Sequence, residues 1–179
     1  MILYHGTNQL IGKINLSKGR ARTDFGLGFY LSDKIGTAQS WATSKTMLLG
    51  GIPTIIQYEL DDNYKELYGY RFFEIPSVEW LDFVVSNRKA NEKGSLIKEP
   101  RHDFNWVSGP IADDKMNDVV KIYIAGSISK EEAIRRACIL PRTFQVSIHT
   151  AKAIEFINED DVLYRQLKNG KWTRNWIKR

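Results

Sequence analysis

The sequence predicts a mixed α+β domain, and three patterns carry that prediction. Residues 34–49 place apolar side chains at helical spacing and are followed by two glycines, which is typical of an amphipathic helix and its end. A Ser-x-x-Glu capping box precedes residues 130–139 and predicts a helix there. Residues 143–149 alternate strictly between apolar and polar side chains, so we expect a strand with one face in a core.

The other elements follow from shorter signals along the chain. Ser32 or Asp33 is the expected N-cap of the first helix. A polar loop is expected over residues 89–103. Residues 106–112 and 119–125 fit two strands or a strand and a short helix, and their spacing leaves both alternatives open. The remaining predictions are strands over residues 2–5, 29–32 and 53–60, and a helix from residue 76 to about residue 89.

Composition limits the class of protein. A chain of 179 residues with 42% apolar and 12% aromatic residues suits one globular domain over residues 1–179 and excludes a wholly disordered chain. The single cysteine, Cys138, excludes an internal disulfide and is expected to be buried on its helix. One cysteine and three scattered histidines argue against a metal site. Without a signal peptide or an apolar span, we expect a cytoplasmic protein with no membrane partner.

The positive charge is concentrated at the C-terminus. The chain carries 26 Lys and Arg against 21 Asp and Glu, a net charge of +5, and residues 165–179 hold six of the bases and no acid. Trp172 and Trp176 are interleaved with these cations. Two interpretations stay open. The segment either binds phosphates or an acidic partner, with its indoles available for stacking, or docks its tryptophans on the core and leaves its cations solvated.

Two motifs and one strand are candidates for chemistry. Residues 3–7 read LYHGT, a short expected strand that runs into a turn. Residues 24–30 read DFGLGFY, a glycine-rich stretch that leads into the next expected strand. Residues 145–149 read QVSIH within the alternating strand. Because the glycine-rich stretch precedes a strand and not a helix, it is not a Rossmann dinucleotide fingerprint, and the sequence contains no P-loop.

In this order the three segments resemble the ADP-ribosyltransferase superfamily, in the branch of diphtheria toxin and the poly(ADP-ribose) polymerases. That branch has a strand ending in His-Gly, a Gly-x-Gly-aromatic-Tyr segment, and a last strand that opens with Glu. The chain is also similar to a group of small bacterial proteins of this superfamily with a DFGxGFY segment and a QxSxHT strand. The resemblance implies a split β-sheet core with flanking helices around an NAD cleft.

The resemblance also implies a role for each matching residue. His5 would donate a hydrogen bond to a ribose hydroxyl of NAD, and the backbone of Gly6 would pair with the nicotinamide carboxamide. Thr7 would support the adenosine ribose. Tyr30 would stack on the nicotinamide, and Trp41 matches the aromatic that closes the other side of that ring in the polymerases, although packing in the core is an equal alternative for it. The implied NAD-binding set is His5, Gly6, Thr7, Gly28, Tyr30 and Trp41.

One residue departs from the family pattern. Gln145 stands where the family has the Glu that hydrogen-bonds the nicotinamide ribose and offsets the cationic transition state, so the implied catalytic set is His5, Tyr30 and Gln145. At an effective dielectric near 20, a carboxylate about 4 Å from a unit positive charge is worth roughly 4 kcal/mol, or around a thousandfold in rate. Gln keeps the hydrogen bond and loses the charge, so polymerisation of ADP-ribose is not expected.

Three outcomes of this departure stay open: slow mono-transfer, an acid supplied from elsewhere, or a protein that only binds. The candidate acids are Asp24, Asp113 and Asp114. A second register is that of the arginine-directed toxins, which place Gln or Glu two residues before the catalytic Glu, and it would put Ser147 in the catalytic position. His149 lies on the same polar face and is either an assisting group or a histidine satisfied by the backbone.

The leading hypothesis is an NAD-dependent mono-ADP-ribosyltransferase, with NAD as co-substrate and a protein or nucleic acid as acceptor. Small bacterial members often act as toxins, so the resemblance implies a toxin-antitoxin or conflict role and an antitoxin protein as partner. The rivals are an NAD- or ADP-ribose-binding module without turnover and a nucleic-acid-binding protein acting through residues 165–179. Arg20 and Arg22 are candidates to meet the NAD diphosphate or are solvated, and Arg88 has the same two interpretations.

Overall fold

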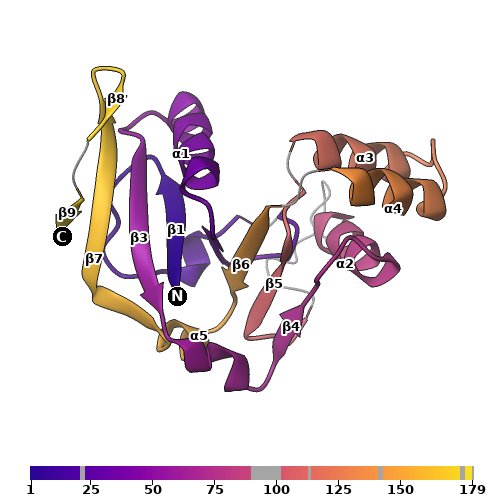
Figure 1. Cartoon of the computed structure of the whole chain (residues 1–179), viewed down its shortest axis with the longest axis horizontal. Helices are drawn as coiled ribbons and strands as arrows, with labels where there is room; N and C mark the ends of the chain where they lie inside the picture. Colours follow the sequence, from indigo (N-terminus) through magenta and orange to yellow (C-terminus); the bar gives the residue numbers. More distant parts are fainter. Residues whose placement is uncertain (21–22, 90–101, 113, 141–142, 174–175, 179) are drawn as a thin grey trace.

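The fold is built on one large, mostly antiparallel sheet (Figure 1). The computed structural model describes residues 1–20, 23–89, 102–112, 114–140, 143–173 and 176–178. The strands are β1 (Ile2–Thr7), β2 (Phe29–Ser32), β3 (Thr54–Leu60), β4 (Tyr70–Phe72), β5 (Trp106–Pro110), β6 (Phe144–Ile148), β7 (Ile157–Lys168), β8 (Lys171–Trp172) and β9 (Ile177–Lys178). Their order is β4-β5-β6-β2-β1-β3-β7-β8, with β9 paired to β7. The pair β4–β5 is parallel, and the other described pairs are antiparallel.

The helices fall into two groups. They are α1 (Ile35–Leu49), α2 (Val78–Lys89), α3 (Asp114–Ile124), α4 (Lys130–Ile139) and α5 (Ala151–Ile154). Helix α1 packs against β1 and β3, whereas α2, α3 and α4 pack together at the other end of the sheet, beside β4 and β5 (Figure 1). The α+β class predicted from the sequence is therefore confirmed.

Most predicted elements are found at or near their expected residues. Helix α4 begins where the capping box predicts, with the Ser129 hydroxyl accepting a hydrogen bond from the Glu132 amide at 3.2 Å. The two alternatives for residues 106–112 and 119–125 resolve as a strand, β5, followed by a helix, α3. Most of the expected polar loop, residues 90–101, lies outside the described residues.

The predicted N-cap of α1 is wrong. The cap position is Lys34, whose side chain makes no capping hydrogen bond. Ser32 lies fully buried at the end of β2, where its hydroxyl accepts from the Lys34 amide at 3.1 Å. The helix therefore begins two residues later than a Ser32 cap would require, because pairing in the sheet holds Ser32 in the strand.

The expected burial of Cys138 is also wrong, because the residue is exposed. Ala133 and Ala137 form the buried side of α4. Cys138 follows Ala137 and is turned about 100° further round the helix, which carries it out of the core. Its thiol lies 3.3 Å from the carbonyl oxygen of Pro76.

The C-terminal residues continue the sheet, which the sequence did not predict. Strand β7 runs along β3, and β8 folds back on it as a hairpin. The Trp176 ring lies 4.4 Å from the Arg165 guanidinium and stacks with Tyr4 at 6.0 Å. These contacts agree with the docking interpretation of residues 165–179 for Trp176. Arg174 and Arg179 lie outside the described residues, and a nucleic-acid role for the segment stays a prediction.

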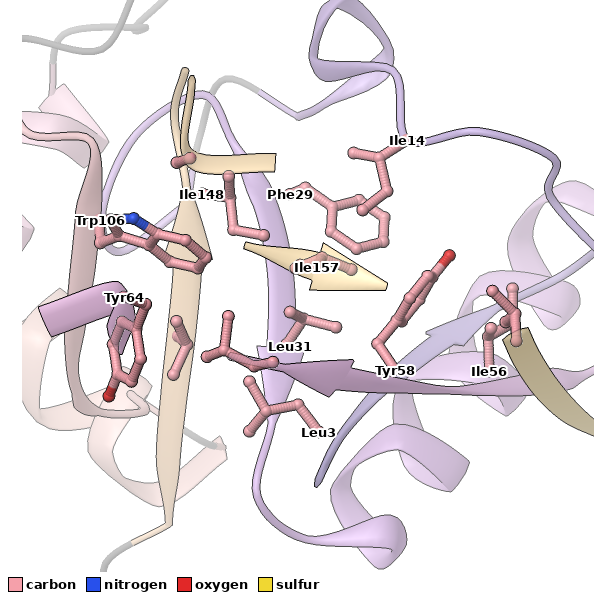
Figure 2. Close-up of a cluster of buried hydrophobic side chains, with 14 of the residues drawn as sticks. Leu3, Ile14, Phe29, Leu31, Ile56, Tyr58, Tyr64, Trp106, Ile148 and Ile157 are labelled. Atoms are coloured by element: carbon pink, nitrogen blue, oxygen red, sulfur yellow. The ribbon is translucent and has the colours of Figure 1, made fainter. Parts of the chain in front are cut away.

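Two hydrophobic cores lie on the two faces of the sheet. The first, drawn in Figure 2, gathers side chains from six strands: Leu3, Phe29, Leu31, Ile56, Tyr58, Trp106, Val146, Ile148, Ile157 and Val162. The second is built around Trp80, Leu81, Val107, Met116 and Val120, where α2, α3 and α4 cover β5. Alternation along β6 follows from this arrangement, because Val146 and Ile148 enter the first core while Gln145 and Ser147 face the other way.

The two halves of the sheet meet at a narrow join. Strands β1 and β2 share a single residue pair, Tyr4 with Ser32, whereas β1 pairs with β3 along all six of its residues. Beyond Tyr4 the two strands run apart toward Thr7 and Phe29, which leaves a wedge between them. Among the described residues no helix is long and apolar enough to cross a membrane.

Helix α1 crosses β1 at Gly6, and this close approach yields a stability prediction. A Cβ at Gly6 would lie 2.1 Å from the Ala38 carbonyl oxygen, so Gly6→Ala forces α1 away from the sheet. We expect a loss of about 3 kcal/mol in the free energy of unfolding, measured by urea denaturation. Gly36→Ala is the matched control, because a Cβ there meets nothing within 4 Å, and it should be neutral or stabilising by about 0.5–1 kcal/mol. Equal stability of the two variants would contradict this packing.

Candidate functional site

A cavity of about 700 Å³ occupies the wedge between β1 and β2. Its lining comes from β1 and the connection after it, the glycine-rich segment before β2, α1 and β6. The sequence-predicted residues that it brings together are His5, Gly6, Thr7, Gly28, Tyr30, Trp41 and Gln145. Of the candidate acids, Asp24 also lines the cavity, whereas Asp113 and the side chain of Asp114 lie outside the described part of the chain.

The segment before β2 is held by the Tyr30 side chain. The Tyr30 hydroxyl accepts from the Phe25 amide at 3.0 Å and donates to the Gly26 carbonyl oxygen at 2.7 Å. The Thr23 hydroxyl lies 2.7 Å from the same oxygen. Burial raises the pKa of the Tyr30 hydroxyl, which therefore stays protonated at neutral pH. The hydroxyl is committed to the protein, and the aromatic ring is the part of Tyr30 that remains for a ligand.

All three histidines of the chain hold backbone carbonyls in or next to this segment. A carbonyl oxygen only accepts hydrogen bonds, so each contact places the proton on the histidine nitrogen and fixes the tautomer. The contacts are His5 Nδ1 to Tyr30 O at 2.8 Å, His102 Nε2 to Phe25 O at 2.9 Å and His149 Nδ1 to Leu27 O at 2.8 Å. The histidine side chains thus replace the backbone partners that an irregular segment lacks.

The geometry of His5 changes the role expected for it. Burial lowers the pKa of His5 to about 4, so the ring is neutral at pH 7. Its Nδ1 hydrogen is committed to Tyr30, and Nε2 therefore carries a lone pair. In this state His5 accepts a hydrogen bond from a hydroxyl group, where the resemblance implied that it donates one. The ring is steadied by stacking on Phe29 at 4.3 Å.

The two predicted glycines are required by packing. At Gly6 the limiting neighbour is α1, as described above. At Gly28 a Cβ would lie 2.7 Å from the Ile148 carbonyl oxygen and 2.8 Å from the His149 ring. Glycine at both positions is therefore explained without a ligand, although both residues also line the cavity.

A buried polar cluster joins Gln145 to Asp24 and Arg88. Gln145 Nε2 donates to Asp24 Oδ2 at 2.9 Å, and both residues are almost fully buried. The Arg88 guanidinium donates to Asp24 Oδ1 through Nη2 at 2.5 Å and through Nε at 3.1 Å. Of the two interpretations of Arg88, neither holds, because α2 directs it to a carboxylate inside the protein. The sequence named these three residues separately and did not predict that they meet.

Ser147 and His149 form a separate contact beneath the cavity floor. Ser147 is fully buried, and its hydroxyl lies 2.8 Å from His149 Nε2 and 3.2 Å from the Val107 carbonyl oxygen. His149 is satisfied by the backbone, as one of its two interpretations had it. Because Gln145 lines the cavity and Ser147 is buried behind it, the geometry favours the register that puts Gln145 in the catalytic position.

Cations gather at the cavity, which the sequence motifs did not predict. Lys13, Lys18, Arg20 and Lys45 are among its lining residues. Lys45 Nζ lies 3.4 Å from the Thr7 hydroxyl, and burial together with the charge of Arg20 lowers the pKa of Lys45. Lys13 is paired with Asp160 at 2.7 Å. Lys45 follows Trp41 by one helical turn, and that spacing was the available signal; Arg22 lies outside the described residues.

No group of metal-ligating side chains occurs among the residues that the structure describes. The donor set of the cavity is instead one neutral histidine, an amide and several cations. Such a set suits an anionic organic ligand with hydroxyl groups.

The buried histidines predict a pH dependence of stability. Burial lowers the pKa of His149 to about 3 and also lowers that of His102, while in the unfolded chain both are near 6.5. Between these values the unfolded chain binds more protons, so the free energy of unfolding falls as pH falls. From pH 7 to pH 5 we expect a loss of about 2 kcal/mol for each such histidine, measured by urea denaturation.

The variant His149→Gln provides the control for this prediction. Gln lacks the titrating ring, so the variant should be less stable at pH 7 but should lose less of its stability between pH 7 and pH 5. An unchanged slope in the variant would show that His149 does not titrate in the unfolded chain alone.

Comparison with known proteins places the chain in a family. A family described as proteins of unknown function, DUF3990, matches residues 1–158. No curated protein and no solved structure matches the chain. The matched region contains every residue of the cavity named above and ends at the start of β7. The chain therefore belongs to the DUF3990 family, whose function is unknown.

Proposed function

We propose that the protein is an NAD-dependent mono-ADP-ribosyltransferase, which uses NAD as co-substrate and transfers ADP-ribose to a protein or nucleic acid. The observation that carries the proposal is the meeting of the three resembling segments. Residues 3–7, 24–30 and 145–149 lie far apart in sequence, and all three contribute side chains to one cavity. The resemblance was stated on the sequence motifs, so their convergence in space is an independent support.

The chemistry of the cavity suits a dinucleotide. Its volume falls within the usual range of about 300–1,000 Å³ for ligand sites. Lys45 and Arg20 offer positive charge for a diphosphate. Tyr30 and Trp41 offer aromatic faces for flat heterocycles, and His5 Nε2 offers an acceptor for a ribose hydroxyl.

The proposed reaction exchanges one bond at the ribose. The bond between C1′ and the nicotinamide nitrogen breaks, and its electron pair leaves with nicotinamide. The acceptor atom then bonds to C1′ and releases its proton to solvent. His5 and Gln145 would hold the ribose, and the aromatic residues would hold the nicotinamide, so that positioning supplies most of the acceleration. Transfer of a single ADP-ribose follows from Gln145 in place of Glu.

The biological role proposed here follows the resemblance alone. Small bacterial members of the superfamily often act as toxins, and a toxin in a toxin-antitoxin or conflict system, opposed by an antitoxin protein, is the expected setting.

A second candidate function is an NAD- or ADP-ribose-binding module without turnover. It is favoured by the state of Asp24, the carboxylate next to Gln145. Asp24 accepts hydrogen bonds from Arg88, Gln145 and the Ala112 amide, so it offers no free carboxylate to the cavity.

Trp41→Ala tests the proposed site most cleanly. Trp41 lines the cavity, whereas Tyr30 also holds the loop before β2 and its removal would disturb the fold. We expect the wild-type protein to bind NAD and release nicotinamide, and Trp41→Ala to weaken NAD binding about tenfold, because stacking on an aromatic ring is worth about 1–3 kcal/mol. Calorimetry measures the binding, and chromatography of free nicotinamide measures turnover.

Trp172→Ala is the matched control, since Trp172 lies in the β7–β8 hairpin and should leave NAD binding unchanged. Labelled NAD with total protein and total RNA as acceptors identifies the class of product. Tight binding without nicotinamide release would favour the binding module. Absence of NAD binding by the wild-type protein would overturn both functions.

A further inference from the structure

The hydrogen bond between Gln145 and Asp24 determines which end of the Gln145 amide faces the cavity. Gln145 Nε2 lies 2.9 Å from Asp24 Oδ2. A carboxylate oxygen only accepts hydrogen bonds, so the amide nitrogen and not the carbonyl oxygen must face it. The reverse orientation would bring two lone pairs together. The carbonyl oxygen Oε1 is therefore the end of Gln145 that is left to meet a ligand in the cavity that both residues line.

Asp24 is well fixed for this task. Its Oδ1 accepts from Arg88 Nη2 and Nε, and its Oδ2 accepts from the Ala112 amide at 2.9 Å as well as from Gln145. Four donors fill the roughly four acceptor positions of a carboxylate. Arg88 is itself anchored to Asn117 Oδ1 at 2.6 Å. Asp24 has no acceptor position left for substrate or for a proton in transit, so it is neither a base nor a ligand of the site.

We propose that Asp24 is a positioning residue that makes Gln145 a hydrogen-bond acceptor for the ribose of NAD, an inference that rests on the function proposed above. Gln145 Oε1 accepts from a ribose hydroxyl while C1′ loses nicotinamide. In the absence of another acceptor, water bonds to C1′ and gives its proton to bulk solvent. Gln145 takes no proton in this reaction, and Asp24 contacts only Gln145, Arg88 and the backbone.

This arrangement gives Gln145→Glu an unusual expected result. The substitution restores the residue of the resembling family, yet it places a second carboxylate against Asp24 Oδ2 at the position where Nε2 now donates. Two carboxylates in contact do not both ionise readily, so the pair retains a proton until higher pH. The double variant Asp24→Asn with Gln145→Glu removes this conflict, because an amide at position 24 can donate to a carboxylate at position 145.

The experiment compares nicotinamide release and NAD binding in the full chain across these variants between pH 6 and pH 9. Asp24→Asn should lower kcat at least tenfold and leave KM for NAD within about threefold of wild type. Gln145→Glu should also be slow at pH 7, and its rate should fall further as pH rises, whereas the wild-type rate stays flat. The double variant should recover at least the wild-type rate with a flat profile.

Controls separate this role from a loss of folding. Asp82→Asn is a matched acid-to-amide change, since Asp82 pairs with Lys130 on the surface and should leave kcat unchanged. Because Asp24→Asn also weakens the contact with Arg88, Gln145→Met is a second probe that keeps the Asp24–Arg88 pair. It should lose as much kcat as Asp24→Asn while thermal unfolding shows a folded protein.

The possible results decide the proposal. A Gln145→Glu variant that is faster than wild type at pH 7 with a flat pH profile would overturn it, and so would Asp24→Asn or Gln145→Met with a wild-type kcat. Failure of the double variant to recover would assign Asp24 to folding alone. If the wild-type protein neither binds NAD nor releases nicotinamide, the proposed function fails. In that case a stability coupling between the two substitutions would leave the pair as a structural contact, which also overturns the positioning role.

Discussion

The site depends on one constraint, which is that buried backbone carbonyls need hydrogen-bond donors. The stretch between Thr23 and Tyr30 runs through the interior without a regular ladder of its own. The Tyr30 hydroxyl and the three histidines supply donors to its carbonyls and to that of Tyr30. These side chains come from β1, β2, the end of β6 and the chain before β5, so the segment is fixed only when all of those parts have assembled. The cavity wall that it forms is consequently a product of the whole fold.

This constraint explains what the sequence could and could not predict. Periodicity and capping are local signals, and they predicted α1, α4 and β6 at nearly their observed residues. The motifs predicted which residues line the cavity, because each lies at the end of a strand that could be recognised. The ion pair of Asp24 with Arg88 joins residues 64 positions apart and has no local signal. Strand β7 was missed because three consecutive acids, residues 159–161, interrupt its apolar alternation.

The same residues meet two demands at this site. Gly6 admits α1 to the sheet and also gives the cavity an open wall beside His5. Tyr30 holds a loop with its hydroxyl and offers a ring with the rest of its side chain. A residue of this kind shows the same sequence motif whether it serves packing, binding or both. Motif resemblance alone therefore cannot separate an active transferase from a binding module, whereas the hydrogen bonds of Gln145 and Asp24 give the two possibilities different chemistry.

The narrow join between β1 and β2 has a consequence for the energetics of ligand binding. On one face of the sheet, the core of Figure 2 runs without a break beneath both halves, from Leu3 and Ile56 on one side to Trp106 and Ile148 on the other. The wedge above it is therefore braced from below, although few backbone hydrogen bonds cross it. A ligand entering such a preorganised space spends little of its interaction energy on ordering the protein, and more of that energy remains as affinity.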